Sequence, residues 1–399
     1  MRRRIRRPPG EELAARRRRA VLFGVVGFVL FVIVLRAVAC GGDDEKAAKK
    51  APETATQRLT RSLSSTQLVG QTIVSPFRNA GPGEIPPAIR SAIRAGRIGG
   101  VILFSENAST VADVRRLTDR LQRITRPGAL NGVPLLVMTD QEGGQVRRIT
   151  DAPPRTSARA QGAAGVGVIQ QQARASATAL CRAGVNVTLG PVVDSGTGVL
   201  ATQERLFAAD APTVARSSRA FINGAHESGI AVTAKHFPGL GRAQADTDET
   251  RVRVDASLDV LRSQDEVPFR TAIGAGTDLV MLSSAIYPAL SPAPAVLSPP
   301  VVQNELRGRL GFKGVTISDD LEAGAFAGAS SPAQVARAAS QAGVDLLLYG
   351  TTTDAALAAS RALTADLRDG RLQLNALRTS VVRSLDLRAR LARSCRPAG

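Results

Sequence analysis

Along most of the chain, short apolar runs alternate with longer stretches of helix-like character. The runs are rich in Val, Ile and Leu and lack polar alternation, which is typical of parallel strands covered on both faces. They predict eight strands, over residues 68–76, 99–105, 134–139, 185–191, 231–236, 279–284, 314–318 and 344–349. The segments between them are long enough for crossover helices, and no GxGxxG turn follows the first run. We therefore expect an α/β fold, a (β/α)₈ TIM-like barrel rather than a doubly wound sheet.

The beginning of the chain has a different pattern. Residues 1–19 hold nine arginines against two glutamates, and residues 20–35 are an unbroken run of sixteen apolar or glycine positions. An arginine-rich flank before a short apolar stretch predicts a basic cytoplasmic segment over 1–19 and a membrane segment over 20–40. We therefore expect a cell-membrane protein whose remaining chain lies outside the cytoplasm.

The end of this membrane segment leaves two alternatives open. The sequence AVAC-GG around Cys40 resembles a bacterial lipoprotein cleavage site, so Cys40 is a candidate for lipidation, and an uncleaved signal anchor is the alternative. Residues 41–62 are polar and rich in Ala, Thr, Lys and Glu, which predicts a flexible tether. A barrel domain is then expected over residues 63–399.

Composition and charge narrow the classes of function. The 399 residues are 44% apolar, so the chain can bury a large core. The formal net charge of +18 would favour nucleic acid as a partner, but the chain has no Trp and only 3% aromatic residues. Nucleic-acid binders usually combine a basic surface with stacking aromatic side chains, so we expect no nucleic-acid partner.

Unusual polar residues follow the predicted strands. Only two of the five lysines lie beyond the tether, and one of them, Lys235, stands beside one of the two histidines of the chain. Helix capping explains one or two aspartates after strands, but it does not explain a Lys-His pair. Because the C-terminal strand ends form the active-site face of a barrel, we expect a site there. The residues at these ends are Asp140, Asp194, Lys235 with His236, Ser283 with Ser284, and Asp319 with Asp320.

Five motifs carry a family resemblance over about residues 65–395. They are GGVILFSEN (99–107), TDQEGGQVRRI (139–149), QERLFAAD (203–210), AKHFPGLGRAQADTDET (234–250) and GFKGVTISDDLEAGAF (311–326). Together they resemble family 3 glycoside hydrolases of the single-domain, NagZ-like β-N-acetylglucosaminidase (β-N-acetylhexosaminidase) type. The resemblance implies a (β/α)₈ barrel and retaining hydrolysis of a terminal β-linked sugar through a covalent glycosyl-enzyme.

The resemblance also implies roles for individual residues. Asp319 would be the nucleophile, and Asp320 is expected to cap the next helix or brace the loop. Retaining glycosidases need a second carboxyl group about 5 Å from the nucleophile as proton donor. The side chains that would hold the sugar hydroxyls are Asp140, Arg148, Arg205, Lys235 and His236.

The chain departs from the family pattern at the proton donor. The family sequence reads KHFPGHG and then Asp-Ser-His, whereas this chain has Leu240 at the first of these histidines and Asp246-Thr247-Asp248 in the loop. Burial and the neighbouring Asp246 would raise the pKa of Asp248, so Asp248 is the expected acid/base, assisted by Asp246. Glu249 is the alternative proton donor.

These observations predict a membrane-tethered exo-β-glycosidase that acts on N-acetylglucosamine ends of cell-wall glycans or their fragments. A monomer is expected, with no cofactor, and the spacing of His, Cys and carboxylates predicts no metal site. A glycan-binding barrel without turnover is the alternative, favoured by loss of the loop histidine. A two-lobed solute-binding lipoprotein is disfavoured by the even strand spacing. If Cys40 is lipidated, Cys181 and Cys395 could pair as a disulfide.

Overall fold

A computed structural model of the chain describes residues 53–78, 80–328 and 331–394. The predicted cytoplasmic and membrane segments, Cys40 and Cys395 lie outside these residues. In the described part, no helix combines the length and the apolar character needed to cross a membrane.

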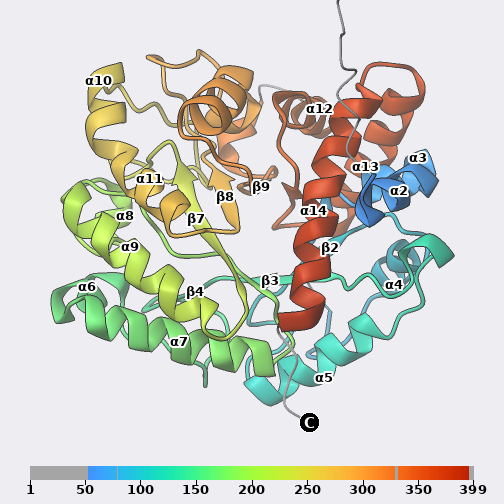
Figure 1. Ribbon diagram of the computed structural model, residues 1–399, viewed down its shortest axis with the longest axis horizontal. Coiled ribbons are helices and arrows are strands. Elements are labelled where there is room, and N and C mark those ends of the chain that lie inside the picture. Colours follow the sequence, from blue (N-terminus) through green and yellow to red (C-terminus); the bar gives the residue numbers. More distant parts are fainter. Residues whose placement is uncertain (1–52, 79, 329–330, 395–399) are drawn as a thin grey trace, which may run out of the picture. The chain divides into compact units, whose positions relative to one another are not determined.

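Eight parallel strands form the centre of the molecule (Figure 1). Each pairs with the next in spatial order, β10-β1-β2-β3-β6-β7-β8-β9. A parallel bridge between Ile317 and Leu346 joins β9 to the start of β10 and closes the ring. The expected TIM-like α/β fold is thus confirmed. The strands are β1 (Ile73–Ser75), β2 (Gly100–Ile102), β3 (Leu136–Thr139), β6 (Val187–Thr188), β7 (Ala231–Phe237), β8 (Leu279–Leu282), β9 (Val315–Ser318) and β10 (Leu347–Leu348).

Helices surround the strands (Figure 1). Many begin at a residue whose side chain accepts a hydrogen bond from the first turn, such as Thr110, Asp210 and Thr352. A short antiparallel hairpin, β4 (Gln141–Gly143) with β5 (Val146–Arg147), follows β3. The helices are α2 (Ala55–Ser62), α3 (Ser65–Gly70), α4 (Pro87–Arg94), α5 (Val111–Gln122), α6 (Ala158–Ala164), α7 (Val166–Arg182), α8 (Val199–Thr202), α9 (Ala211–His226), α10 (Leu258–Val260), α11 (Val267–Gly274), α12 (Pro332–Ala342), α13 (Thr353–Arg368) and α14 (Leu374–Ser394), with π-helical turns at 261–265 and 300–309.

The last helix covers one end of the barrel. Leu387 and Leu391 of α14 belong to the apolar cluster that fills the barrel interior. Between them the buried Arg388 donates to the carbonyl oxygen of Pro134 (2.7 Å) and to Oε1 of Gln71 (2.6 Å), both of which precede strands. Because α14 covers the N-terminal strand ends, the opposite end is left for a site.

Two segments near residue 60 differ from the sequence prediction. The strand expected over 68–76 starts only at Ile73, because Ser64 and Gln67 form a reciprocal cap that begins α3 and places Leu68 in a helix. A continuous apolar run does not distinguish a buried helix from a buried strand. The last eight residues of the expected tether form α2, which packs against α14. The barrel domain therefore begins before residue 63.

Candidate active site

A cavity of about 470 Å³ lies at the C-terminal ends of the strands. Its lining includes every residue that the sequence singled out for catalysis or sugar binding except the alternative acid Glu249. These residues are Asp140, Arg148, Arg205, Lys235, His236, Asp246, Asp248 and Asp319. The fold therefore brings together side chains that lie up to 179 residues apart in the sequence, from Asp140 to Asp319.

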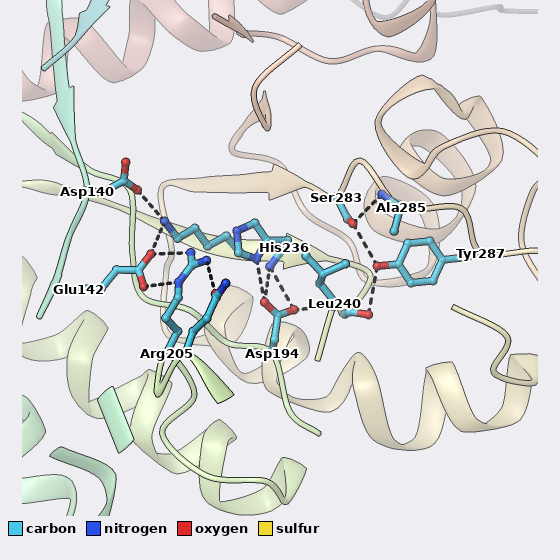
Figure 2. Close-up of polar contacts among 12 residues, drawn as sticks. Asp140, Glu142, Asp194, Arg205, His236, Leu240, Ser283, Ala285 and Tyr287 are labelled. Carbon is cyan, nitrogen blue, oxygen red and sulfur yellow. Dashed lines mark hydrogen bonds and ion pairs between the residues drawn. The ribbon is translucent and has the colours of Figure 1, made fainter. Parts of the chain in front are cut away.

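Lys235 of β7 is the centre of a buried charge cluster. Its Nζ lies 2.7 Å from Oδ1 of Asp140 and 2.8 Å from Oε1 of Glu142, and the side chain is only 2% exposed. Arg205 donates two hydrogen bonds of 2.9 Å to the same Glu142 carboxylate (Figure 2). Two cations thus face two anions, an arrangement that fixes the direction of all four side chains.

The charges in this cluster stabilise one another. Burial alone would raise the pKa of Glu142, but the cations of Arg205 and Lys235 outweigh it and hold this pKa far below its usual range. Burial likewise opposes the charges of Lys235 and Arg205, yet the neighbouring carboxylates raise both pKa values. All members of the cluster except Glu142 were expected from the sequence. Glu142 could have been found from its position in TDQEGG, two residues after Asp140. Alternate residues of an extended chain share one face, so Glu142 is expected on the same face as Asp140.

His236 is oriented by a buried carboxylate. Its Nδ1 lies 2.8 Å from Oδ2 of Asp194, whose oxygens also accept the backbone N–H groups of His236 and Leu240 (Figure 2). Since the Asp194 carboxylate accepts a hydrogen bond from Nδ1, the other ring nitrogen, Nε2, remains available to a ligand in the cavity. The Tyr287 hydroxyl lies 3.1 Å from both Ser283 Oγ and the carbonyl oxygen of Gly239. These contacts fix the turn after β7.

The loop with the expected proton donor is held from two sides. Asp246 accepts the backbone N–H of Asp248 (3.0 Å) on Oδ1 and the side-chain amide of Gln203 (3.0 Å) on Oδ2. Gln203 in turn accepts from Arg205 at 3.4 Å, so it connects the charge cluster to this loop. On the other side, Gly324 donates its N–H to the carbonyl oxygen of Asp248 at 2.8 Å.

Asp248 has a strongly perturbed carboxyl group. Its side chain is open to solvent on one side, but partial burial, followed by the negative charges of Asp319, Asp246 and Asp320, raises its pKa to about 7. His236 acts in the opposite direction. A carboxyl group with this pKa holds a proton in part of the molecules near neutral pH, as a general acid must.

Asp319 and Asp320 come directly after β9. Asp319 is half-buried, lines the cavity and accepts the backbone N–H of Asp320 at 3.0 Å. Asp320 instead accepts the backbone N–H groups of Glu322 and Gly350, both at 2.9 Å, and the Thr351 hydroxyl at 3.2 Å. Asp320 therefore braces the loops after β9 and β10, which is one of the two structural roles expected for it.

Other candidate residues lie away from this cavity. His226 at the end of α9 pairs with Asp278 at 2.9 Å. Cys181 of α7 is disulfide-bonded, while its expected partner Cys395 lies outside the described residues. Over residues 53–78, 80–328 and 331–394, no group of His, Cys, Asp and Glu side chains is arranged to hold a metal ion.

Comparison with known proteins gives consistent matches. Residues 67–387 match the glycosyl hydrolase family 3 N-terminal domain. A β-hexosaminidase from Stenotrophomonas maltophilia is 37% identical over 274 residues, which are 66% of this chain and 80% of that protein. An uncharacterised secreted glycosyl hydrolase from Arthroderma benhamiae is 37% identical over 322 residues, 78% of this chain and 90% of that one. A family 3 β-N-acetylglucosaminidase structure from Paenibacillus superposes with a TM-score of 0.78 at 33% identity, over 83% of this chain and 63% of that longer chain.

Proposed function

Because the chain belongs to glycosyl hydrolase family 3 and is a β-N-acetylhexosaminidase-like glycoside hydrolase, we propose that it removes terminal β-linked N-acetylglucosamine from cell-wall glycans or their fragments. We further propose that Asp319 is the nucleophile and Asp248 the general acid/base. The observation that carries this assignment is that both carboxyl groups line one cavity and that Asp248 has a pKa of about 7.

The sugar site would be formed by the residues around Lys235. Asp140, Arg205 and Lys235 present fixed charges to the cavity, and His236 presents Nε2. Arg148 lines the same cavity, and its guanidinium carbon lies 5.7 Å from the centre of the Phe104 ring. Fixed donors and acceptors of this kind suit the hydroxyl groups of one terminal sugar. Glu142 contributes indirectly, because it orients both cations.

The reaction proceeds in two steps. The Asp319 carboxylate attacks the anomeric carbon while Asp248 gives its proton to the leaving oxygen, so the glycosidic bond breaks and a glycosyl ester of Asp319 forms. Asp248, now ionised, removes a proton from water, and the resulting attack at the same carbon releases Asp319. Two inversions give a product with retained configuration. Asp246 would assist by holding the Asp248 backbone and by favouring its protonated form.

The cellular location is also part of the proposal. The arginine-rich residues 1–19 and the apolar residues 20–40 support a membrane tether, through a lipid on Cys40 or through an uncleaved anchor. The secreted relative supports an extracytoplasmic location for the barrel. At this place the enzyme would act as a monomer on glycan of the cell envelope.

A trapping experiment tests the nucleophile. A 5-fluoro analogue of N-acetylglucosaminyl fluoride retains the acetamido group and slows hydrolysis of the ester, so mass spectrometry should find one sugar on the peptide that contains Asp319. Asp319→Asn should prevent labelling, while Asp320→Asn serves as the neighbouring control. A label on another residue would refute the assignment. Binding of N-acetylglucosamine without labelling or turnover of any β-glycoside would favour the glycan-binding alternative.

A further inference from the structure

A group of arginines lies on α4, on α13 and in the loop before β2. Arg94 is the last residue of α4, and Arg97 follows it three residues before β2. Arg361 and Arg368 belong to α13, which packs against α4 (Figure 1). Ser360 of α13 donates its hydroxyl to the carbonyl oxygen of Arg97 at 3.2 Å, so this contact joins the two groups. We call Arg94, Arg97, Arg361 and Arg368 the basic patch.

The basic patch and the cavity lie toward opposite ends of α13. Thr351, two residues before this helix, lines the cavity, whereas Arg368 is the last residue of the helix. A helix of 16 residues is about 24 Å long at 1.5 Å per residue. Arg97 precedes β2 and therefore lies at the N-terminal strand ends, the end of the barrel that α14 covers. A partner that binds the basic patch would leave the cavity entrance free.

The side chains of the basic patch are accessible. Arg94, Arg361 and Arg368 are exposed. Arg97 is half-buried, and its Nη2 lies 3.1 Å from Ser91 Oγ on α4. Arg361 and Arg368 are seven residues apart, so they lie on the same face of α13. The patch is therefore an open basic surface rather than part of the core.

The carboxylates near the end of α13 are bound to other arginines. Asp366 is 1% exposed and accepts hydrogen bonds from Arg337 (2.6 Å) and Arg371 (2.5 Å). Arg371 also pairs with Asp369 at 2.6 Å. The remaining carboxylate of α13, Asp354, lies in the first turn at the other end of the helix, and α4 has neither Asp nor Glu. The helices that carry the basic patch therefore do not neutralise it.

Helix stability accounts for part of this charge. Arg94 and Arg368 lie in the last turns of their helices, where a cation interacts favourably with the helix dipole. That effect is confined to the terminal turn, so it does not explain Arg361 in the middle of α13 or Arg97 outside a helix. The surrounding sequence is basic as well, with six arginines and one carboxylate between residues 54 and 97. The charge therefore favours an anionic partner.

The sequence before the barrel indicates which anionic partner is near. Residues 41–54 separate Cys40 from the first described helix, α2, and a chain of this length spans at most about 50 Å even when fully extended. A barrel tethered at Cys40 stays beside the bilayer, and the tether makes binding to that bilayer an intramolecular step. Each arginine close to an anionic bilayer strengthens binding about fivefold. An anionic membrane surface therefore complements the basic patch in both charge and position.

We propose that the basic patch binds the anionic lipid headgroups of the membrane to which the chain is tethered. The barrel then docks on the bilayer through α4 and α13, and the cavity entrance faces away from the lipid, toward the glycan of the cell envelope. This inference rests on the proposed membrane location and does not depend on the reaction in the cavity. A bilayer rather than a soluble polyanion is the partner, because the tether keeps the bilayer within reach.

The test measures how the full chain is oriented on vesicles. The protein is reconstituted into vesicles of phosphatidylcholine, with or without phosphatidylglycerol, that carry an acceptor dye on the headgroups. A donor dye is attached through an unnatural amino acid that replaces Ala358, exposed one turn before Arg361, or Glu106, exposed in the loop after β2 on the cavity side. In anionic vesicles we expect more energy transfer from position 358 than from position 106. The difference should vanish in neutral vesicles and in 1 M salt, where the Debye length is about 3 Å.

Two variants with equal loss of charge assign the docking to the basic patch. The patch variant combines Arg94→Gln, Arg361→Gln and Arg368→Gln. The control variant changes three exposed arginines of α9 and α11, and combines Arg216→Gln, Arg219→Gln and Arg270→Gln. The patch variant should lower the ratio of docked to free barrel about 100-fold, since three fivefold contributions are lost, and the control should keep it. Lysine at the three patch positions should restore docking, because a bilayer surface attracts either cation.

Each outcome supports or contradicts the inference. Equal transfer from positions 358 and 106 in anionic vesicles, or equal effects of the two variants, would overturn it. If soluble polyphosphate abolishes the difference at a charge concentration below that of the lipid, the partner is a soluble polyanion and the inference is also wrong. Release of the protein from neutral vesicles would refute the proposed tether, whereas patch-dependent binding to anionic vesicles would still support lipid binding. Hydrolysis measured on the same samples reports the proposed reaction separately.

Discussion

The pH dependence of hydrolysis follows from the surroundings of Asp248. The general acid must be protonated in the first step, so kcat/KM should fall as the pH rises through the pKa of Asp248, which is about 7. Removing a neighbouring negative charge should lower this pKa and move the falling limb to lower pH. Asp246→Asn makes that change with nearly the same volume.

The size of the shift can be worked from the geometry. Asp246 Oδ1 lies 3.0 Å from the backbone N of Asp248. This places the two carboxyl groups within about 8 Å, where unit charges at an effective dielectric constant near 20 interact by ~2 kcal/mol, or roughly 1.5 pH units. Because Asp248 is open to solvent on one side, screening reduces the expected shift to about one unit.

The opposite change provides a second arm. Gln203 donates to Asp246 at 3.0 Å, so Gln203→Glu adds a negative charge beside that carboxylate and should move the limb to higher pH. The assay is the pH profile of kcat/KM on an N-acetylglucosaminide with a poor leaving group, for which bond cleavage requires the acid. Glu249→Gln is the matched control, since Glu249 does not line the cavity.

The three profiles separate the two candidate acids. If Asp246→Asn and Gln203→Glu leave the limb unchanged, the raised pKa of Asp248 does not control it. If Glu249→Gln removes the limb, the proton donor is Glu249. Only opposite shifts in the first two variants, with none in the third, agree with the reasoning.

Four further outcomes are expected. Glu142→Gln should lower the free energy of unfolding, measured by urea denaturation, by about 3–5 kcal/mol, because the buried Lys235 and the half-buried Arg205 lose their shared anion. Gly324→Ala would place a Cβ 2.2 Å from the carbonyl oxygen of Glu249, so kcat should fall up to about 100-fold while the melting temperature reports an intact fold. In phosphate buffer the product should be the free sugar rather than its 1-phosphate, since ionised Asp248 repels phosphate. Mass spectrometry of the membrane-bound protein should find a lipid on Cys40, and intact residues 1–19 would instead indicate an anchor.

Residues at strand ends could be predicted because a barrel places all C-terminal strand ends on one face. This rule predicts Asp140, Lys235 and Asp319, which the structure places in the cavity lining. The same rule predicts Asp194, Ser283 and Ser284, which do not line the cavity. Strand limits were less certain, since β6 covers only Val187–Thr188 of the predicted run. The ends of strands and helices depend on local hydrogen bonds, such as those of helix caps. A run of apolar residues does not reveal these hydrogen bonds, so it does not predict where an element ends.

The partners of the supporting residues could not be predicted, because they are distant in the sequence. Glu142 is 63 residues from Arg205, and Gln203 is 43 residues from Asp246. Asn107 donates its side-chain amide to the carbonyl oxygen of Phe77, 30 residues away. A glutamine or asparagine in a loop has no local pattern that distinguishes such a role from an exposed position. The alternation that places Glu142 on the same face as Asp140 does not indicate that Arg205 is its partner. The order of the strands around the barrel is needed to show which loops lie next to each other and which residues can therefore pair.

An aspartate can act as proton donor near neutral pH only if burial and nearby carboxylates together raise its pKa. The Asp248 carbonyl oxygen accepts a hydrogen bond from Gly324, in the loop after β9 that also carries Asp319. Asp246 accepts a hydrogen bond from Gln203, in the loop after β6. These two contacts keep like charges together against their repulsion, and that repulsion helps to raise the pKa of Asp248. A histidine would need no such arrangement to titrate near neutral pH, because its ordinary pKa is already about 6.5. If Asp248 is the acid/base, as proposed, its raised pKa therefore depends on the contacts of Gly324 and Gln203 as well as on its own carboxyl group.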